Sequence, residues 1–190
     1  MSTVETIKVD EEILLRWPSM ADAEELFKLI DTNREHLGRW LPWVDAIQSL
    51  DDEKGWIETT AAAKAKDQEW PPLIIYRDSI VGAIGTDRYF DPLHKVCGIG
   101  YWLAVDYQGR GIVTWACSAV INHLFGPLGM NRVQLRISPG NERSVAIAQR
   151  LGFVFEGVSR QSWLVNGQFL DMAVYSVLAS EWRSRGASRA

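Results

Sequence analysis

The stretch YWLAVDYQGRGIVTWA, residues 101–116, changes character twice in sixteen residues. An apolar strand-like run passes through QGRG directly into a helical pattern, without a proline or a long loop. Amides at a helix start lack intrahelical partners, and the helix dipole adds positive potential there. Gly109 and Gly111 remove side chains that would block an anion, and Arg110 adds charge. The loop suits a pyrophosphate, although an ordinary tight turn stays open on the glycines alone.

The spacing of this loop excludes two common phosphate sites. It is not G-x-x-x-x-G-K-[ST], so an NTPase loop does not fit, and it is not the G-x-G-x-x-G of dinucleotide-binding folds. If the loop binds an anionic cofactor, that cofactor is held neither by an NTPase loop nor by a dinucleotide-binding motif.

Composition restricts the classes of protein. The chain has 190 residues, suited to a single domain over residues 1–190 with a frayed polar tail at 183–190. A net charge of −4 argues against nucleic acid as a direct partner. No apolar run reaches the length of a membrane span. We therefore expect neither a nucleic-acid nor a membrane partner.

The cysteines and histidines carry no metal pattern. Cys97 and Cys117 stand apart without a secretory leader, which predicts a reducing cytoplasmic location. His36, His94 and His123 are scattered, so no metal site is expected.

Periodicity and turn residues predict a mixed α/β order. The predicted strands are residues 11–17, 73–77, 80–90, 97–105, 132–138, 154–165 and 168–178, with NG joining the last two and DS in the hairpin turn after residue 77. The predicted helices are residues 20–30, 33–44 (ended by Pro42), 49–67, 111–125 and 141–152. The run at 97–105 is apolar enough to suggest burial on both faces. The fold class is a mixed sheet with helices on its faces.

Two motifs together carry a resemblance. GYWLAVDYQGRGIVTWA followed by NERSVAIAQRLGFVFEG (141–157) resembles the GNAT acetyltransferase superfamily, and more narrowly the ribosomal-protein N-acetyltransferases of the RimJ/RimL branch. The likeness covers nearly the whole chain. It implies the GNAT fold, a mostly antiparallel sheet with a splayed parallel strand pair and helices on both faces, and acetyl-CoA as cofactor. Relatives are often dimers, so we expect a homodimer.

The resemblance also assigns cofactor contacts. The pyrophosphate would meet main-chain amides of the loop, and the pantetheine arm would pair with the splayed strand. The implied positions are Trp102, Leu103, Ala104, Val105, Gln108, Gly109, Arg110, Gly111, Ile112, Val113, Asn141 and Ser144. Val113 is larger than the usual residue there, a departure that related enzymes tolerate.

Acyl transfer to an amine needs a neutral amine, a stabilised oxyanion and a proton for the leaving thiolate. An amide of the splayed strand, at Leu103 or Ala104, is the expected oxyanion donor. Asn141 and Ser144 read on spacing alone as an ordinary helix cap. The resemblance makes Ser144 the proton donor to the thiolate, directly or through a water.

The general base is missing from its usual place. The branch has a glutamate after [KR]-Q-A, but here RQSW puts Trp163 at that position. Glu156, Asp91 and Asp171 are possible substitutes, each more readily explained as structural. An α-amino group with a pKa near ~7.7 is about one-sixth neutral at pH 7, whereas a lysine near ~10.4 is neutral about once in 2,500. The missing base therefore favours an α-amine acceptor.

Tryptophans gather in the segment that lines the acceptor entrance in this family. The acceptor-binding residues implied are Asn33, Trp40, Trp43 and Trp163. Such a wall suits an aromatic or nucleobase-bearing acceptor, although Trp40 and Leu37 would equally pack a helix onto the sheet. Three functions stay open: acetylation of a protein N-terminus, acetylation of small aminoacyl compounds or other amines in detoxification, and a non-catalytic acyl-CoA sensor.

Overall fold

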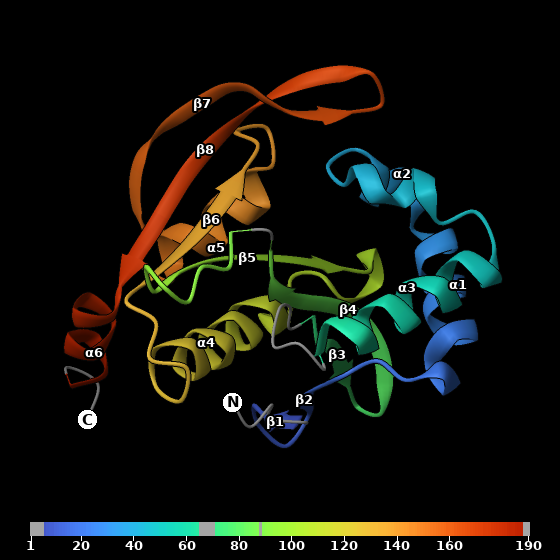
Figure 1. The fold of residues 1–190 in the computed structure, drawn as a ribbon, viewed down its shortest axis with the longest axis horizontal. Coiled ribbons are helices and arrows are strands. Elements are labelled where there is room, and N and C mark those ends of the chain that lie inside the picture. Colours follow the sequence, from blue (N-terminus) through green and yellow to red (C-terminus); the bar gives the residue numbers. More distant parts are fainter. Residues whose placement is uncertain (1–5, 65–70, 88, 188–190) are drawn as a thin grey trace.

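The structure is a computed structural model that describes residues 6–64, 71–87 and 89–187 (Figure 1). Its sheet has eight strands in the order β1-β2-β3-β4-β5-β6-β8-β7. The strands are β1 (Thr6–Lys8), β2 (Ile13–Arg16), β3 (Leu73–Tyr76), β4 (Ser79–Thr86), β5 (Val96–Leu103), β6 (Arg132–Ile137), β7 (Val154–Val165) and β8 (Gln168–Leu178). Six α-helices accompany them: α1 (Ala23–Thr32), α2 (Arg34–Gly38), α3 (Leu50–Lys64), α4 (Ile112–Phe125), α5 (Glu142–Arg150) and α6 (Ala179–Ala187).

One strand pair breaks the antiparallel pattern. β5 and β6 run parallel, and they pair only from Val96–Gly98 to Arg132–Gln134. Beyond Gly98 the strands separate, while β5 stays antiparallel to β4 as far as Leu103. The predicted mixed sheet with a splayed parallel pair is confirmed.

The sheet buries a separate core on each face. Because side chains alternate along a strand, Ile74 of β3 packs with α4, whereas its neighbours Leu73 and Ile75 pack with α1 and α2. The helices therefore lie on both faces, as predicted. The open end of β5 and β6 lies between these two layers (Figure 1).

Several local predictions are confirmed. Ser49 and Asp52 exchange hydrogen bonds at the start of α3. Asn166 and Gly167 form the β7–β8 turn with φ of 49° and 74°. Gly152 closes α5 with φ of 71°. The end of the third predicted helix, at residues 65–67, lies outside the described residues.

Other local predictions were wrong. The β3–β4 turn uses Arg77 and Asp78, not residues 78–79, with φ of 48° and 66°. Pro42 does not end a helix; it starts the 3-10 helix η2 (Pro42–Ala46), where its fixed φ and missing N–H are tolerated. The tail predicted to fray over residues 183–190 is helical in α6 as far as Ala187, residues 188–190 lie outside the described residues, and its fraying stays a prediction.

The strand at the centre of the motif also differs from its prediction. β5 ends at Leu103, and Val105 begins the 3-10 helix η3 (Val105–Tyr107). Gly100 is exposed, and Tyr101 and Trp102 are half-buried, so β5 is not buried on both faces along its whole length. The exposed part is the part that separates from β6.

Candidate active site

The glycine loop has the geometry that an anion requires. Gly109 and Gly111 adopt φ of 77° and 79°, in the left-handed region that favours glycine. Gly111 is the N-cap of α4. Among the described residues, no acceptor takes up the amides from Gly109 to Val113. The side chains of Ile112 and Val113 are buried in the core, so their contribution to an anion is their amides alone.

Arg110 and Gln108 flank this loop differently. Arg110 is exposed and lies over the ring of Tyr107, 5.5 Å from its centroid, while donating to Asp106 O. The side-chain nitrogen of Gln108 lies 2.9 Å from His36 Nε2. Burial, then the charges of Arg143 and Arg39, lower the pKa of His36, which favours the neutral imidazole. The loop is thereby fastened to α2.

The hydrogen-bond pattern of β5 decides which amides face the opening. Ala104 N donates to Val81 O and Asp87 N to Gly98 O, both at 2.9 Å, so the even-numbered residues of β5 bond to β4. The amides of Tyr101 and Leu103 must then point toward the side of β6, beyond its described pairing. Of the two expected oxyanion donors, the amide of Ala104 is occupied and that of Leu103 faces the gap.

The main chain of Val105 and the side chain of Asn33 are joined by a hydrogen bond. Val105 N donates to Asn33 Oδ1 at 2.9 Å, and Asn33 Nδ2 donates to Leu29 O at 2.8 Å. Asn33 is buried, at 9% exposure. These two bonds join α1 to the end of β5, and the acceptor contact of Asn33 and the cofactor contact of Val105 stay predictions.

Asn141 and Ser144 lie at the start of α5, beside the opening. Asn141 Oδ1 caps the helix by accepting from Ser144 N at 3.3 Å. The hydroxyl of Tyr101 lies 3.5 Å from Ser144 O, which places Ser144 next to the free edge of β5. Burial raises the pKa of Tyr101, so this phenol keeps its proton. The Ser144 hydroxyl makes no hydrogen bond to a described residue.

The three candidate substitutes for the missing base, all among the described residues, make other contacts. Arg132 binds both oxygens of Glu156 at 2.6 and 2.5 Å, and this pairing lowers the Glu156 pKa to about 2. Asp91 is half-buried and bound to His94, whose hydrogen bonds lower the pKa of Asp91. Asp171 is exposed and accepts from Gln161 N. Glu156 and Asp91 are thus held as carboxylates in structural pairs.

Four tryptophans make contacts near the opening, and three of them are the predicted acceptor residues Trp40, Trp43 and Trp163. The rings of Trp43 and Trp102 are 6.1 Å apart at 54°. Trp163 Nε1 donates to Trp40 O at 3.1 Å. The Trp40 ring lies over Gly140, where an added Cβ would stand 3.4 Å from it. Trp102 was predicted only as a cofactor contact, and its contact with Trp43 makes it a further candidate for the predicted aromatic wall.

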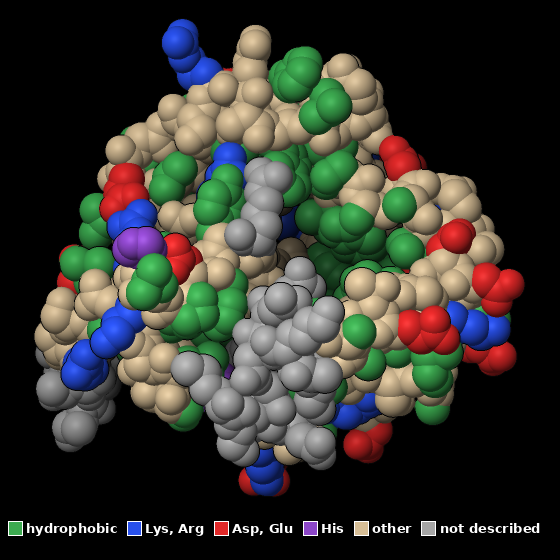
Figure 2. Space-filling view, in the orientation of Figure 1, with side chains coloured by type: hydrophobic (Ala, Val, Ile, Leu, Met, Phe, Trp, Pro, Cys, Tyr) green, Lys and Arg blue, Asp and Glu red, His purple; other side chains and the backbone are tan. Residues whose placement is uncertain are grey.

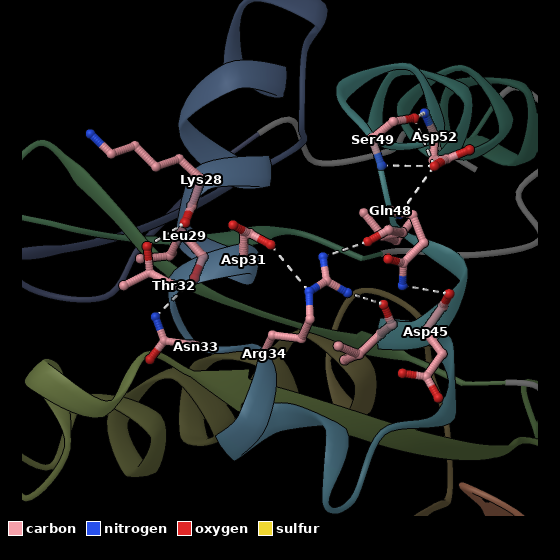
Figure 3. A network of polar contacts seen from close by, with 12 residues as sticks. Lys28, Leu29, Asp31, Thr32, Asn33, Arg34, Asp45, Gln48, Ser49 and Asp52 are labelled. Carbon is pink, nitrogen blue, oxygen red and sulfur yellow. Dashed lines mark hydrogen bonds and ion pairs between the residues drawn. The ribbon is translucent and has the colours of Figure 1, made fainter.

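Arg34 at the start of α2 joins η2 to α1 through polar contacts (Figure 3). Its guanidinium donates to Val44 O at 2.8 Å and Ile47 O at 2.7 Å, and it pairs with Asp31 at 3.1 Å. These bonds fix η2, and with it Trp43, against α1. The tip of the β7–β8 hairpin closes from the other side, where Asn166 Nδ2 donates to Gly38 O at 3.1 Å.

A hollow opens between the β7–β8 hairpin, α2 and β5, and hydrophobic side chains gather around it (Figure 2). The described residues include no cluster of three or more potential metal ligands. Within the same ranges, no helix has the length and apolarity to cross a membrane.

A sheet that opens between two parallel strands, with an anion loop at the opening, defines the class of acyl-CoA-dependent transferases. Comparison makes this specific: residues 12–154 match the acetyltransferase (GNAT) domain. The chain belongs to the GNAT acetyltransferase family and is an N-acetyltransferase.

The similar proteins are acetyltransferases as well. It is 35% identical over 178 residues to the putative ribosomal N-acetyltransferase YdaF of Bacillus subtilis, covering 93% of this chain and 97% of that one. It is 30% identical to the ribosomal-protein-serine acetyltransferase of Escherichia coli, over 90% and 96% of the chains. Among solved structures, the microcin C7 self-immunity acetyltransferase MccE, in complex with acetyl-CoA and AMP, superposes with a TM-score of 0.86 at 31% identity, covering 93% and 97%.

Proposed function

We propose that this protein transfers the acetyl group of acetyl-CoA to an α-amino group, with a ribosomal-protein N-terminus as the model acceptor. The observation that carries the proposal is the gap between β5 and β6. There the Leu103 amide lacks a strand partner among the described residues, and Ser144 lies beside the same edge. An oxyanion donor and a proton donor are the two groups that a thioester requires.

The residues present fit the cofactor. Free amides from Gly109 to Val113 would bind the pyrophosphate, with Gln108 and Arg110 at the sides. Trp102, Leu103 and Ala104 would lie along the pantetheine arm, which would bond to the amides facing the gap. Asn141 would contact the cofactor from α5.

The reaction would be a direct attack in a ternary complex. The acceptor nitrogen bonds to the thioester carbon, and the Leu103 amide stabilises the resulting oxyanion. The carbon–sulfur bond would then break as the Ser144 hydroxyl gives a proton to the thiolate, and the extra proton of the new amide nitrogen would return to Ser144 through water.

The absence of a strong base supports an α-amine. Holding an α-amine neutral at pH 7 costs about 1 kcal/mol, and a lysine roughly 3.5 kcal/mol more. Trp163 stands where the branch has its glutamate, and Glu156 is held by Arg132. A water chain would suffice for the α-amine and would serve lysine poorly.

A second candidate is acetylation of a small aminoacyl compound that carries an aromatic group. Two observations favour it: the Trp43–Trp102 pair beside the opening, and the likeness to MccE, which was solved with AMP. Stacking on exposed faces of such rings contributes about 1–3 kcal/mol per base.

Release of free CoA separates these functions. The assay would compare N-terminal Ser, Ala and Thr peptides, Nα-blocked lysine peptides, and aminoacyl-nucleotide analogues. Turnover with peptide N-termini supports the first proposal, and turnover confined to the analogues supports the second. Tight acetyl-CoA binding without turnover on any acceptor would contradict both and favour a sensor.

A further inference from the structure

Arg136 on β6 is a positive charge held only by neutral groups. Its guanidinium donates to the hydroxyl of Tyr89 and, at 3.0 Å, to Ser162 Oγ, and it lies 5.0 Å from the Tyr89 ring centroid. It forms no ion pair with a carboxylate of the described residues. Arg132, two pleats earlier on the same face of β6, is neutralised by both oxygens of Glu156.

The position of Arg136 places it across the opening from Gly100. Gly98 pairs with Gln134, and two further steps on each strand lead to Gly100 and Arg136 on the same face. This face is opposite to Val133, Leu135 and Ile137, which are buried in the core with α4.

The backbone of Gly100 forms an open floor beside Arg136. A Cβ added at Gly100 would meet no heavy atom within 4 Å. Trp102, one pleat further along β5, carries the Trp43 contact on this same face. Gly98 is different, because the Asp87 carboxyl group already fills the space above it. The space over Gly100 is thus bounded by an aromatic pair, a carboxyl group and an arginine.

A half-buried guanidinium without a counter-ion is poorly solvated and favours an anionic partner. Its rigid fork has five N–H donors, and the two hydroxyls leave some of these unused. Tyr89 comes from the β4–β5 loop and Ser162 from β7, so the fork is held from two sides before any ligand arrives. A pre-positioned arginine of this kind recognises a carboxylate or a phosphoryl group.

We propose that Arg136 is a specificity-determining residue that binds an anionic group on the acceptor, while the acceptor backbone crosses the open floor at Gly100. The inference rests on the proposed function and adds that the acceptor is negatively charged. The preferred acceptor is an α-amine with a carboxylate or phosphoryl group close by. The source is either an acidic residue near a peptide N-terminus or the linker of an aminoacyl nucleotide.

The test compares acceptors matched in shape and different in charge. One pair is an N-terminal serine peptide with Asp or Asn at its second position. The other is a non-hydrolysable aminoacyl nucleotide with an anionic linker and its neutral-linker counterpart. We expect kcat/KM to favour the charged member of at least one pair by about tenfold or more, mainly through KM. The pair that responds identifies the source.

The Arg136→Met variant should abolish this preference, and Arg136→Lys should retain part of it. Arg183→Met, on exposed α6, is the matched loss of one positive charge elsewhere. Equal kcat/KM for both members of both pairs in the unmodified protein would overturn the inference and leave the acetyltransferase proposal intact. If no acceptor turns over, the proposed function fails. In that case the affinity of the same acceptor pairs for the CoA complex, measured by calorimetry, tests the role of Arg136 separately. Equal affinity for the charged and the neutral member of both pairs would overturn that role.

Discussion

At the scale of single residues, the account depends most on the hydroxyl of Ser144. Replacing Ser144 with alanine removes the proposed proton source for the thiolate but keeps the main-chain bonds to Asn141 and Tyr101. We expect kcat to fall about 100-fold with little change in the acetyl-CoA dissociation constant. Steady-state kinetics and calorimetry would measure the two. Ser118→Ala, whose hydroxyl bonds only within α4, is the control, and an unchanged kcat in Ser144→Ala would exclude the proton-donor role.

Residue spacing predicted part of this site. Asn141, Ser144 and the two glycines stand at fixed distances from strand and helix ends, so their placement follows from local patterns. Arg136 and Gly100 were missed, because an arginine in an alternating strand looks like any solvent-facing residue. Asn33 was assigned to the acceptor because its segment lines the entrance. Only the fold reveals that Val105 uses its side-chain oxygen.

At the scale of elements, the start of α4 depends on the left-handed conformation of Gly111. Alanine at this position would be strained by a φ of 79°, although the nearest side chain, Trp115, leaves room at 3.6 Å. We expect Gly111→Ala to weaken acetyl-CoA binding about five- to thirtyfold, since αL strain costs about 1–2 kcal/mol. Gly55→Ala, at an exposed position of α3 with open space and helical φ, is the matched control and should raise stability by up to ~1 kcal/mol. Equal acetyl-CoA affinity in the two variants would contradict the role of the loop.

Elements with strong local signals were predicted, and short ones were not. The NG turn and the Ser49–Asp52 cap each carry their own stabilising geometry, so the sequence around them suffices. β1 was missed because three residues on a sheet edge depend on their partner strand. Pro42 was misjudged because proline both ends helices and starts them, and tertiary contacts of Arg34 decide which.

At the scale of the whole molecule, the β7–β8 hairpin closes the acceptor side against α2. Trp163→Phe removes the bond to Trp40 O, which joins segments 123 residues apart, but keeps most of the aromatic volume. We expect KM for the acceptor to rise about five- to tenfold with acetyl-CoA binding unchanged, as one buried hydrogen bond contributes about 1 kcal/mol. Asn166→Ala should act in the same direction on the neighbouring bond. Acceptor kinetics unaltered in both variants would refute this closure.

Glu53 gives the whole molecule a pH-dependent stability. Its side chain is 1% exposed with Oε2 unpaired, and burial raises its pKa from 4.5 to about 7. Between these values the folded protein holds a proton that the unfolded chain has lost, so the free energy of unfolding falls as pH rises from about 4.5 to 7. Between pH 5 and pH 8 the free energy of unfolding should fall by an amount on the order of 2–3 kcal/mol because of Glu53. We expect Glu53→Gln to remove this fall, as measured by denaturant unfolding at the two pH values. Exposed Glu58→Gln is the control, and parallel pH profiles of Glu53→Gln and the unmodified protein would contradict the assignment.

The arrangement of the strands could be predicted from the sequence more fully than the identity of the acceptor. The splayed pair was predicted from the resemblance to the GNAT superfamily, whereas the proposed acceptor space combines β5, β6, β7 and α2, which no local pattern connects. The most direct measurement is free-CoA release with one serine peptide in two forms, a free α-amine with its lysine blocked and a blocked α-amine with its lysine free. The account predicts turnover with the free α-amine and almost none with the free lysine. Faster turnover of the free lysine would show that a strong base exists and would contradict the central claim.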